Sequence, residues 1–171
     1  MSVAASLLGF VLLVAQTVST PTAPGLHFGA LTITLGMPED EALDLLRQEY
    51  TLRSVPVGGE GITLSPSAPD TAWQLDGPHV HRASMQVRRG RVVGIRMDWG
   101  WGGTQPDPQE LSRQLHAGLP HGECRIYSNS RLFEGDAVVT LGFASETSSL
   151  TLETAESPAA GQRIMLAIHS K

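Results

Sequence analysis

Apolar and polar residues alternate with a period of two through residues 81–99 and again in several segments after residue 122. This alternation limits the possible folds more than any other feature, because successive side chains of a strand point to opposite faces of a sheet. The apolar residues of the first region are Ala83, Met85, Val87, Val93, Ile95, Met97 and Trp99. The pattern predicts strands that bury one face, and the short turns between them predict antiparallel pairing.

The register within residues 81–99 depends on the length of the connecting loop. A two-residue loop would pair Val87 with Val92 and would turn the apolar residues of the second strand to the wrong face. A three-residue loop at residues 88–90, with a glycine in the left-handed conformation, keeps both apolar sets on one face. We therefore expect Met85 to lie opposite Val93.

Four further strands are expected at residues 123–128, 137–143, 148–154 and 163–169. Their predicted inward-facing residues are Cys124, Ile126, Val139, Leu141, Phe143, Leu150, Leu152, Ile164, Leu166 and Ile168. Cys124 is the only cysteine of the chain, so an intrachain disulfide is excluded. Its place on the same face as Ile126 favours a buried thiol over a reactive one.

Two amphipathic segments predict short helices. The first follows Pro38 and opens with three carboxylates at residues 39–41, which suit the exposed N–H groups of a first helical turn. The second begins at Asp107-Pro108, with Glu110 placed to complete a capping box. The fold class is therefore α+β, with two short helices packed on antiparallel meander sheets.

The order of elements is a helix, several strands, a second helix and four strands. It fits either one large sheet or a tandem duplication of a helix-plus-meander unit, and the sequence leaves both open. We expect a leader or anchor at residues 1–19, a linker at 20–29 and one α+β domain at 30–171, with 30–103 and 104–171 as alternative subdomains.

Residues 3–18 form an almost unbroken apolar run. A membrane-spanning helix needs about 20 apolar residues, so a cleaved export signal is favoured over an uncleaved anchor. The expected cleavage is before Thr20, and no cysteine follows the run directly, which excludes a bacterial lipoprotein. We expect an exported protein, periplasmic or secreted, with a membrane anchor at residues 3–18 as the alternative.

The charged residues exclude several classes of function. Seventeen acidic against twelve basic residues give a net charge of −5, which argues against nucleic acid as a partner. The only lysine is the final residue, Lys171, so Schiff-base chemistry and a phosphate-binding loop ending in Gly-Lys-Ser/Thr are excluded.

No pattern of catalytic or metal-binding residues stands out. His79 and His81 share one strand face near Asp76, but the other histidines are scattered, so no metal site is predicted. The chain contains neither a Gly-x-Ser-x-Gly elbow nor a His-Glu-x-x-His motif. We therefore expect no catalytic residues, no cofactor and no enzymatic activity, with an unrecognised small hydrolase as the remaining alternative.

The segment Trp99-Gly100-Trp101-Gly102-Gly103 carries the candidate binding residues. Tryptophan is favoured at recognition hot spots, and the glycines let both rings project from a loop. Trp99 also continues the apolar face of its strand, so a role in the core is the alternative for that residue. Trp99 and Trp101 are the residues we expect to contact a partner, and the oligomeric state is left open.

Three sequence stretches carry a resemblance to known families. They are Ile33-Thr34-Leu35-Gly36-Met37-Pro38-Glu39-Asp40-Glu41-Ala42, Leu45-Leu46, and Val87-Arg88-Arg89-Gly90-Arg91-Val92 with Ile95. In these the chain resembles the small lipoproteins of the outer-membrane barrel-assembly machinery and the repeat of β-lactamase inhibitor proteins. Those families bind proteins and lack catalytic machinery. The resemblance thus implies an extracytoplasmic protein-binding or inhibitory module. A membrane-anchored envelope structural domain is the first alternative, and the small hydrolase is the second.

Overall fold

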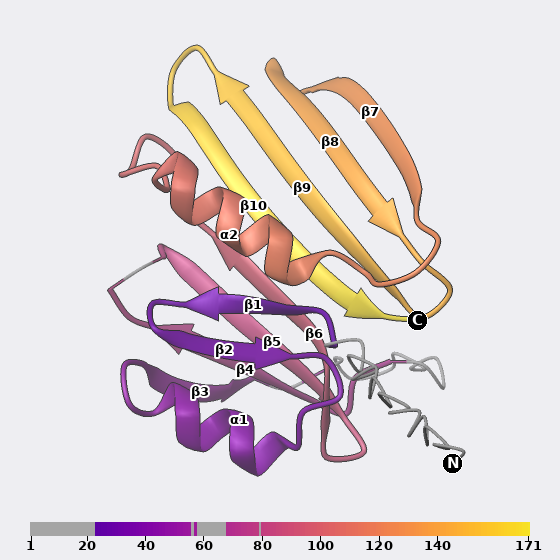
Figure 1. Cartoon of the computed structure of the whole chain (residues 1–171). Coiled ribbons are helices and arrows are strands. Elements are labelled where there is room, and N and C mark those ends of the chain that lie inside the picture. Colours follow the sequence, from indigo (N-terminus) through magenta and orange to yellow (C-terminus); the bar gives the residue numbers. More distant parts are fainter. Residues whose placement is uncertain (1–22, 56, 58–67, 79) are drawn as a thin grey trace, which may run out of the picture.

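The computed structural model describes residues 23–55, 57, 68–78 and 80–171. Their elements, in chain order, are β1 (Gly25–Phe28), β2 (Leu31–Thr34), α1 (Glu39–Leu46), β3 (Thr51–Val55), β4 (Thr71–Asp76), β5 (Arg82–Arg88), β6 (Arg91–Asp98), α2 (Pro108–Gly118), β7 (Arg125–Phe133), β8 (Asp136–Ala144), β9 (Ser148–Ser157) and β10 (Gly161–Ser170). Figure 1 shows the elements along the chain. The α+β fold class is confirmed.

Eight strands form one antiparallel sheet in the order β3-β4-β5-β6-β10-β9-β8-β7. Each half of the sheet is a meander preceded by a helix, and the two meanders meet where β6 pairs with β10 (Figure 1). β1 and β2 form a separate two-stranded hairpin. The four C-terminal strands were therefore predicted in the right order and with the right antiparallel pairing.

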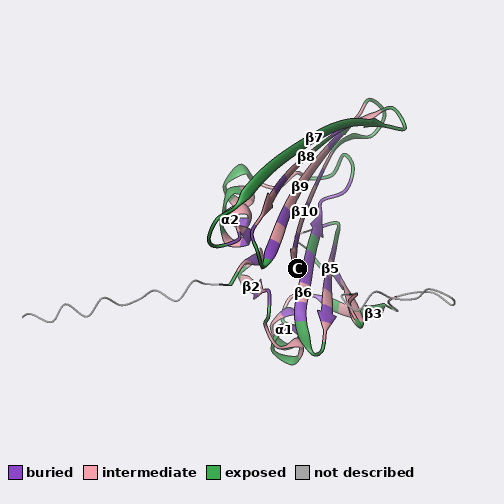
Figure 2. Ribbon diagram, turned by 90° about the vertical axis from the view of Figure 1, so that its right-hand side faces the viewer, coloured by how far each residue is buried: buried purple, intermediate pink, exposed green. Residues whose placement is uncertain are grey.

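The two helices and the β1–β2 hairpin lie on the same side of the sheet (Figure 2). We call the side beneath them the covered face and the other side the open face. The core lies between the helical layer and the covered face, and its fully buried members include Leu26, Phe28, Ile33, Leu46, Leu75, Met85, Ile95, Leu150, Leu166 and Ile168. The inward positions of β5, β6, β9 and β10 thus build the core that the alternation predicts.

The first strand lies in the segment that we expected to be a linker. Leu26 and Phe28 of β1 are 0% and 1% exposed, and the ring of Phe28 meets that of Tyr50 edge to face at 5.8 Å. Gly25 allows the hairpin to close, because a Cβ there would lie 2.5 Å from the carbonyl oxygen of Ile33. A strand of four residues is too short for its alternation to be recognised in a Pro- and Gly-containing segment.

The register predicted for the β5–β6 hairpin is wrong. The loop has two residues, Arg89 and Gly90, with φ of 52° and 68°, as a type I′ turn requires, and it pairs Val87 with Val92. A bulge at Val93 then shifts the register, so that Met85 lies opposite Ile95. The extra residue of the bulge restores the apolar face that a regular ladder would have lost.

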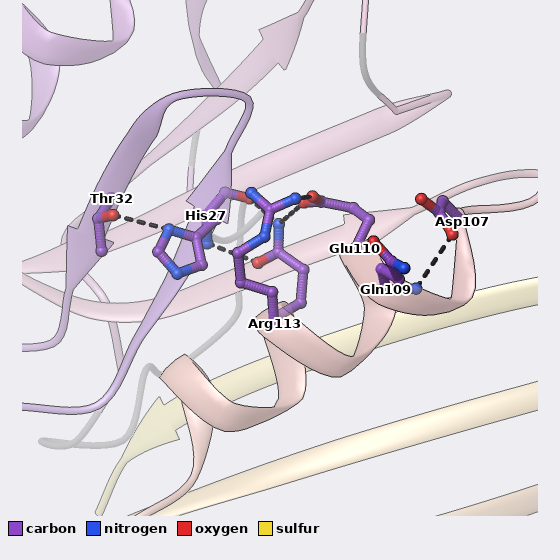
Figure 3. A network of polar contacts seen from close by, with 7 residues as sticks. His27, Thr32, Asp107, Gln109, Glu110 and Arg113 are labelled. Atoms are coloured by element: carbon purple, nitrogen blue, oxygen red, sulfur yellow. Dashed lines mark hydrogen bonds and ion pairs between the residues drawn. The ribbon is translucent and has the colours of Figure 1, made fainter.

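Gln114 of α2 joins the helix to the hairpin through contacts with the backbone of β1. Gln114 is 0% exposed; its side-chain oxygen accepts from the N–H of His27 at 2.5 Å, and its amide nitrogen donates to the carbonyl oxygen of His27. The same nitrogen donates to Glu110 at 2.7 Å. His27 in turn contacts Thr32 through Nδ1 at 2.8 Å (Figure 3). The side-chain amide of Gln114 thus provides the hydrogen bonds that a further strand would otherwise give to the outer edge of β1.

The start of α2 is capped as expected. The side chain of Asp107 accepts from the N–H of Gln109 at 3.0 Å, and Pro108 begins the helix (Figure 3). Glu110 does not serve as the second half of a capping box, because its oxygens accept from Arg113 and Gln114. The start of α1 carries the three expected carboxylates, and one of them, Glu39, accepts from Nε1 of Trp73 at 2.8 Å.

The far end of the covered face is exposed, which corrects the prediction for β7. The register places Ile95, Ile168, Leu150, Phe143 and Ile126 in one row across the sheet. Exposure along this row rises from 1% at Ile95 to 68% at Ile126. Val139, another residue of β8 that was predicted to face inward, is 48% exposed. Cys124 is also exposed and precedes β7, so it is not a buried core residue. Alternation identified the face, but it could not show how far the helical layer extends.

Candidate functional site

The two candidate binding tryptophans lie in different environments. Trp99 is 6% exposed and belongs to the core cluster, whereas Trp101 is 37% exposed. Both follow directly on β6, and Trp99 extends its ladder, because the Trp99 N–H donates to Ile164 at 3.0 Å. Of the two tryptophans, Trp101 is therefore the one that can contact a partner.

Glycines shape the loop that carries Trp101. Gly100 and Gly102 have φ of +73° and +59°, a conformation that other residues rarely adopt. The N–H of Gly102 donates to the carbonyl oxygen of Gln162 at 3.1 Å, which ties the loop to β10. The Arg163 guanidinium lies 5.9 Å from the centre of the Trp101 ring, within the range of a cation–π contact. The ring is held in place before any partner arrives.

A charged pair fixes the base of this loop. Asp98 is 5% exposed and accepts from Nε of Arg163 at 3.0 Å and from its Nη2, while its Oδ1 also accepts from the Gly100 N–H at 2.9 Å. Burial alone would raise the pKa of Asp98, but the Arg163 and Gly100 hydrogen bonds outweigh it and leave this pKa below its ordinary value. The carboxylate is thus ionised at neutral pH and orients both Arg163 and the tryptophan loop.

We expect Asp98→Asn to lower the free energy of unfolding by about 2 kcal/mol at pH 7, because it breaks a partly buried charge-assisted pair. The folded-state pKa of Asp98 lies below the unfolded value of 3.8. The stability from the carboxylate is therefore present above that value and is lost as the pH falls through the folded-state pKa. Urea titrations of both proteins from pH 7 to pH 3 test this. A difference that stays constant over that range would contradict the role of the charge.

A large cavity opens beside the tryptophan loop. Its volume is about 1270 Å³, and it lies between this loop, the β1–β2 turn, the chain before β5 and the first turns of α2. Lining residues include Trp99, Trp101, His81, Glu49, Asp107 and Glu110.

The open face of the sheet adjoins Trp101 through Arg163. The register places Arg53, Gln74, Ser84, Arg96, Ala167 and Thr151 in one row across this face. A neighbouring row contains Arg82, Asp98, Met165 and Glu153. Arg53, Arg82 and Arg96 are exposed, and none of the described elements lies over them (Figure 2). The open face is therefore a broad surface rich in arginine.

A shallow depression lies at the centre of the open face. It has a volume of about 310 Å³ and is lined by residues that include Gly94, Arg96, Glu153, Ala167 and His169. Gly94 forms its floor, since a Cβ there would lie 2.6 Å from Nδ1 of His169. Burial, followed by the charge of Arg96, lowers the pKa of His169. The depression offers a neutral imidazole beside an exposed guanidinium at neutral pH.

The remaining candidate residues are not brought into a common site. His79 lies outside the described residues, and His81 packs against Gly100, where a Cβ would lie 2.9 Å from the imidazole Cγ. Asp70 accepts from the Arg89 N–H at 2.8 Å and so supports the β5–β6 turn. In the part of the chain that the structure describes, no three His, Cys, Asp or Glu side chains gather in a way that could hold a metal ion.

Sequence reasoning missed the arginines of the open face. Arg82, Arg96 and Arg163 occupy the polar positions of the alternating strands, which we treated only as solvent-facing. Each lies on a different strand, so the pairing of β5 with β6 and of β6 with β10 was needed to place them on one face and to bring Arg163 beside Asp98. The sequence alone showed only that each arginine stands at a polar position of an alternating strand.

Comparison with known proteins yields no match among family models, curated proteins or solved structures. Neither helix of the described residues is long and apolar enough to span a lipid bilayer. The apolar run at residues 3–18 lies outside the described residues.

Proposed function

We propose that the protein is an extracytoplasmic, non-catalytic binding or inhibitory module that recognises another protein with the open face and Trp101. One observation carries the proposal: an arginine-rich sheet face that no described element covers adjoins a tryptophan held in an exposed position (Figure 2). Tryptophan and arginine are the residue types most enriched at binding hot spots. A rigid sheet also loses little conformational freedom on binding.

The chemistry of the surface indicates the kind of partner. Arg53, Arg82 and Arg96 are exposed on the open face of a chain whose net charge is −5, so this face offers guanidinium groups to a partner. Carboxylates of a partner would pair with the guanidinium groups in a bidentate manner. An apolar side chain of the partner would fill the space beside Trp101. We therefore propose a partner whose contact surface is acidic around an apolar centre.

Export, the family resemblance and a duplication belong to the same proposal. The apolar run at residues 3–18 supports export as a periplasmic or secreted protein. The repeated order of one helix and four strands, with the halves joined at β6 and β10, supports a duplicated helix-plus-meander unit. The resemblance to barrel-assembly lipoproteins and β-lactamase inhibitor proteins supports the binding role, because those families bind proteins.

We expect Trp101→Ala to leave the fold intact and to weaken the binding of the partner by on the order of 2 kcal/mol, or about 30-fold in the dissociation constant. Affinity capture from an extracytoplasmic extract identifies the partner, and calorimetry with the purified pair measures the loss. Arg47→Ala, at the C-terminal end of α1 on the opposite side of the sheet, is the matched control and should bind as the parent does. Equal binding by Trp101→Ala and the parent would refute the proposed site.

A further inference from the structure

We propose that two copies of the chain associate through β7, with Asn129 of one copy opposite Asn129 of the other on a two-fold axis. β7 is an edge of the eight-stranded sheet, and all nine of its residues are exposed. Among the described residues, seven large hydrophobic side chains are exposed, and Ile126, Tyr127, Leu132 and Phe133 of β7 are four of them. A long apolar edge strand of this kind is a template for pairing with another strand.

The geometry of antiparallel pairing restricts the possible registers. Alternate residues of an edge strand point their backbone N–H and C=O groups outward, and outward residues must lie opposite outward residues. In a symmetric pair the axis must therefore lie between two copies of the same residue. An axis at Asn129 is the one that engages all nine residues of β7.

The side chains of β7 complement one another in that register. Ile126 lies opposite Leu132 of the second copy, and these two are 68% and 81% exposed in the single chain. On the open face, Arg125 lies opposite Phe133 and Tyr127 opposite Arg131. Arginine already contacts an aromatic ring within β7, where Arg131 lies 5.9 Å from the centre of Phe133. No like charges face each other.

The neighbouring registers lack this complementarity. An axis at Ser128 would place Arg125 directly opposite Arg131 of the second copy, and like charges directly opposite destabilise a strand pair. An axis at Ser130 would pair Tyr127 with Phe133, but it would place Leu132 opposite Ser128 and Ile126 opposite Glu134, which lies beyond the strand, so both aliphatic side chains would lose their apolar partner. The sequence of β7 therefore selects a second copy of itself in a single register.

The two-fold axis stands perpendicular to the joined sheet, so the open faces of both copies lie on the same side. Two eight-stranded sheets would form one continuous sheet that presents two copies of Trp101. A nine-residue strand pair gives an interface near the lower limit for specific association, so we expect a dimer with a dissociation constant on the order of 10 µM.

Charge substitution at the axis tests the proposal, using the protein purified after expression of the full chain. Asn129→Asp and Asn129→Lys each place like charges opposite one another, so each should weaken the dimer about tenfold or more in sedimentation equilibrium. An equimolar mixture of the two variants pairs opposite charges and should restore dimers to at least the parental level. Ser54→Asp, on the opposite edge strand β3, is the control and should dimerise as the parent does.

The mixture distinguishes a lost interface from a misfolded variant, because only folded chains can be rescued by each other. Three results would overturn the proposal. The parent could stay monomeric at about 100 µM, well above the expected dissociation constant. Both Asn129 variants could dimerise like the parent, or the mixture could fail to restore the dimers that the single variants lose.

Discussion

Trp99→Ala is expected to lower the free energy of unfolding by about 3–4 kcal/mol, the largest effect of any substitution that we predict. Trp99 is 6% exposed in the core cluster, and its N–H extends the β6–β10 ladder. Removal of the indole leaves a void that the rigid sheet beneath it cannot fill by collapse. Urea denaturation followed by circular dichroism measures the loss.

Trp101→Ala provides the matched control, because the same side chain is removed two residues away. Trp101 is 37% exposed, so its loss should cost less than about 1 kcal/mol, mainly through the contact with Arg163. Similar losses for the two variants would contradict the separation of core and surface roles. Trp101→Ala alone is therefore the suitable variant for measuring binding, because substituting Trp99 as well would disturb the core.

Gln114→Leu is expected to lower the free energy of unfolding by about 3 kcal/mol. The substitution removes both hydrogen bonds to the backbone of His27, and it leaves an N–H and a C=O of β1 without partners at a buried contact. Leucine has a similar volume, so the loss reports the hydrogen bonds rather than a cavity. Hydrogen exchange of the His27 amide should become faster together with the loss of stability.

Gln109→Leu is the control for this prediction, because Gln109 lies exposed on the same helix and its hydrogen bond to Asp107 uses the backbone N–H, which leucine keeps. Its effect should stay within about 0.5 kcal/mol. If Gln114→Leu were as stable as the parent, the hairpin would not be held by this side chain. The attachment of β1–β2 to α2 would then have to rest on apolar packing alone.

Strand alternation predicted the part of the fold that depends on local pattern. β9 and β10 bury the inward residues expected of them, such as Leu150 and Leu166. The same reasoning failed at β7, because the exposure of Ile126 depends on where the helical layer ends. It also failed at the β5–β6 turn, where a bulge at Val93 compensates for the two-residue loop.

The candidate site was predicted only in part. The glycines around Trp101 indicated an exposed loop, and its positive φ angles agree with that expectation. Trp99 is separated from Trp101 only by Gly100, yet it lies in the core, because its N–H extends the β6–β10 ladder and its side chain continues the apolar face of β6. Arg163 contacts Asp98 because β10 pairs with β6, and the two residues are 65 positions apart in the sequence. No local pattern could reveal this contact.

The central claim is that the open face carries the binding surface, and site-specific photocrosslinking tests it most directly. A benzoylphenylalanine residue would replace Ser84, which lies on the open face beside Arg96, or Ser112, which is exposed on α2 at the opposite side. We expect one partner protein to be crosslinked from position 84 and not from position 112 in the native extracytoplasmic environment. A partner crosslinked from position 112 alone would place recognition on the helical side and would contradict the account.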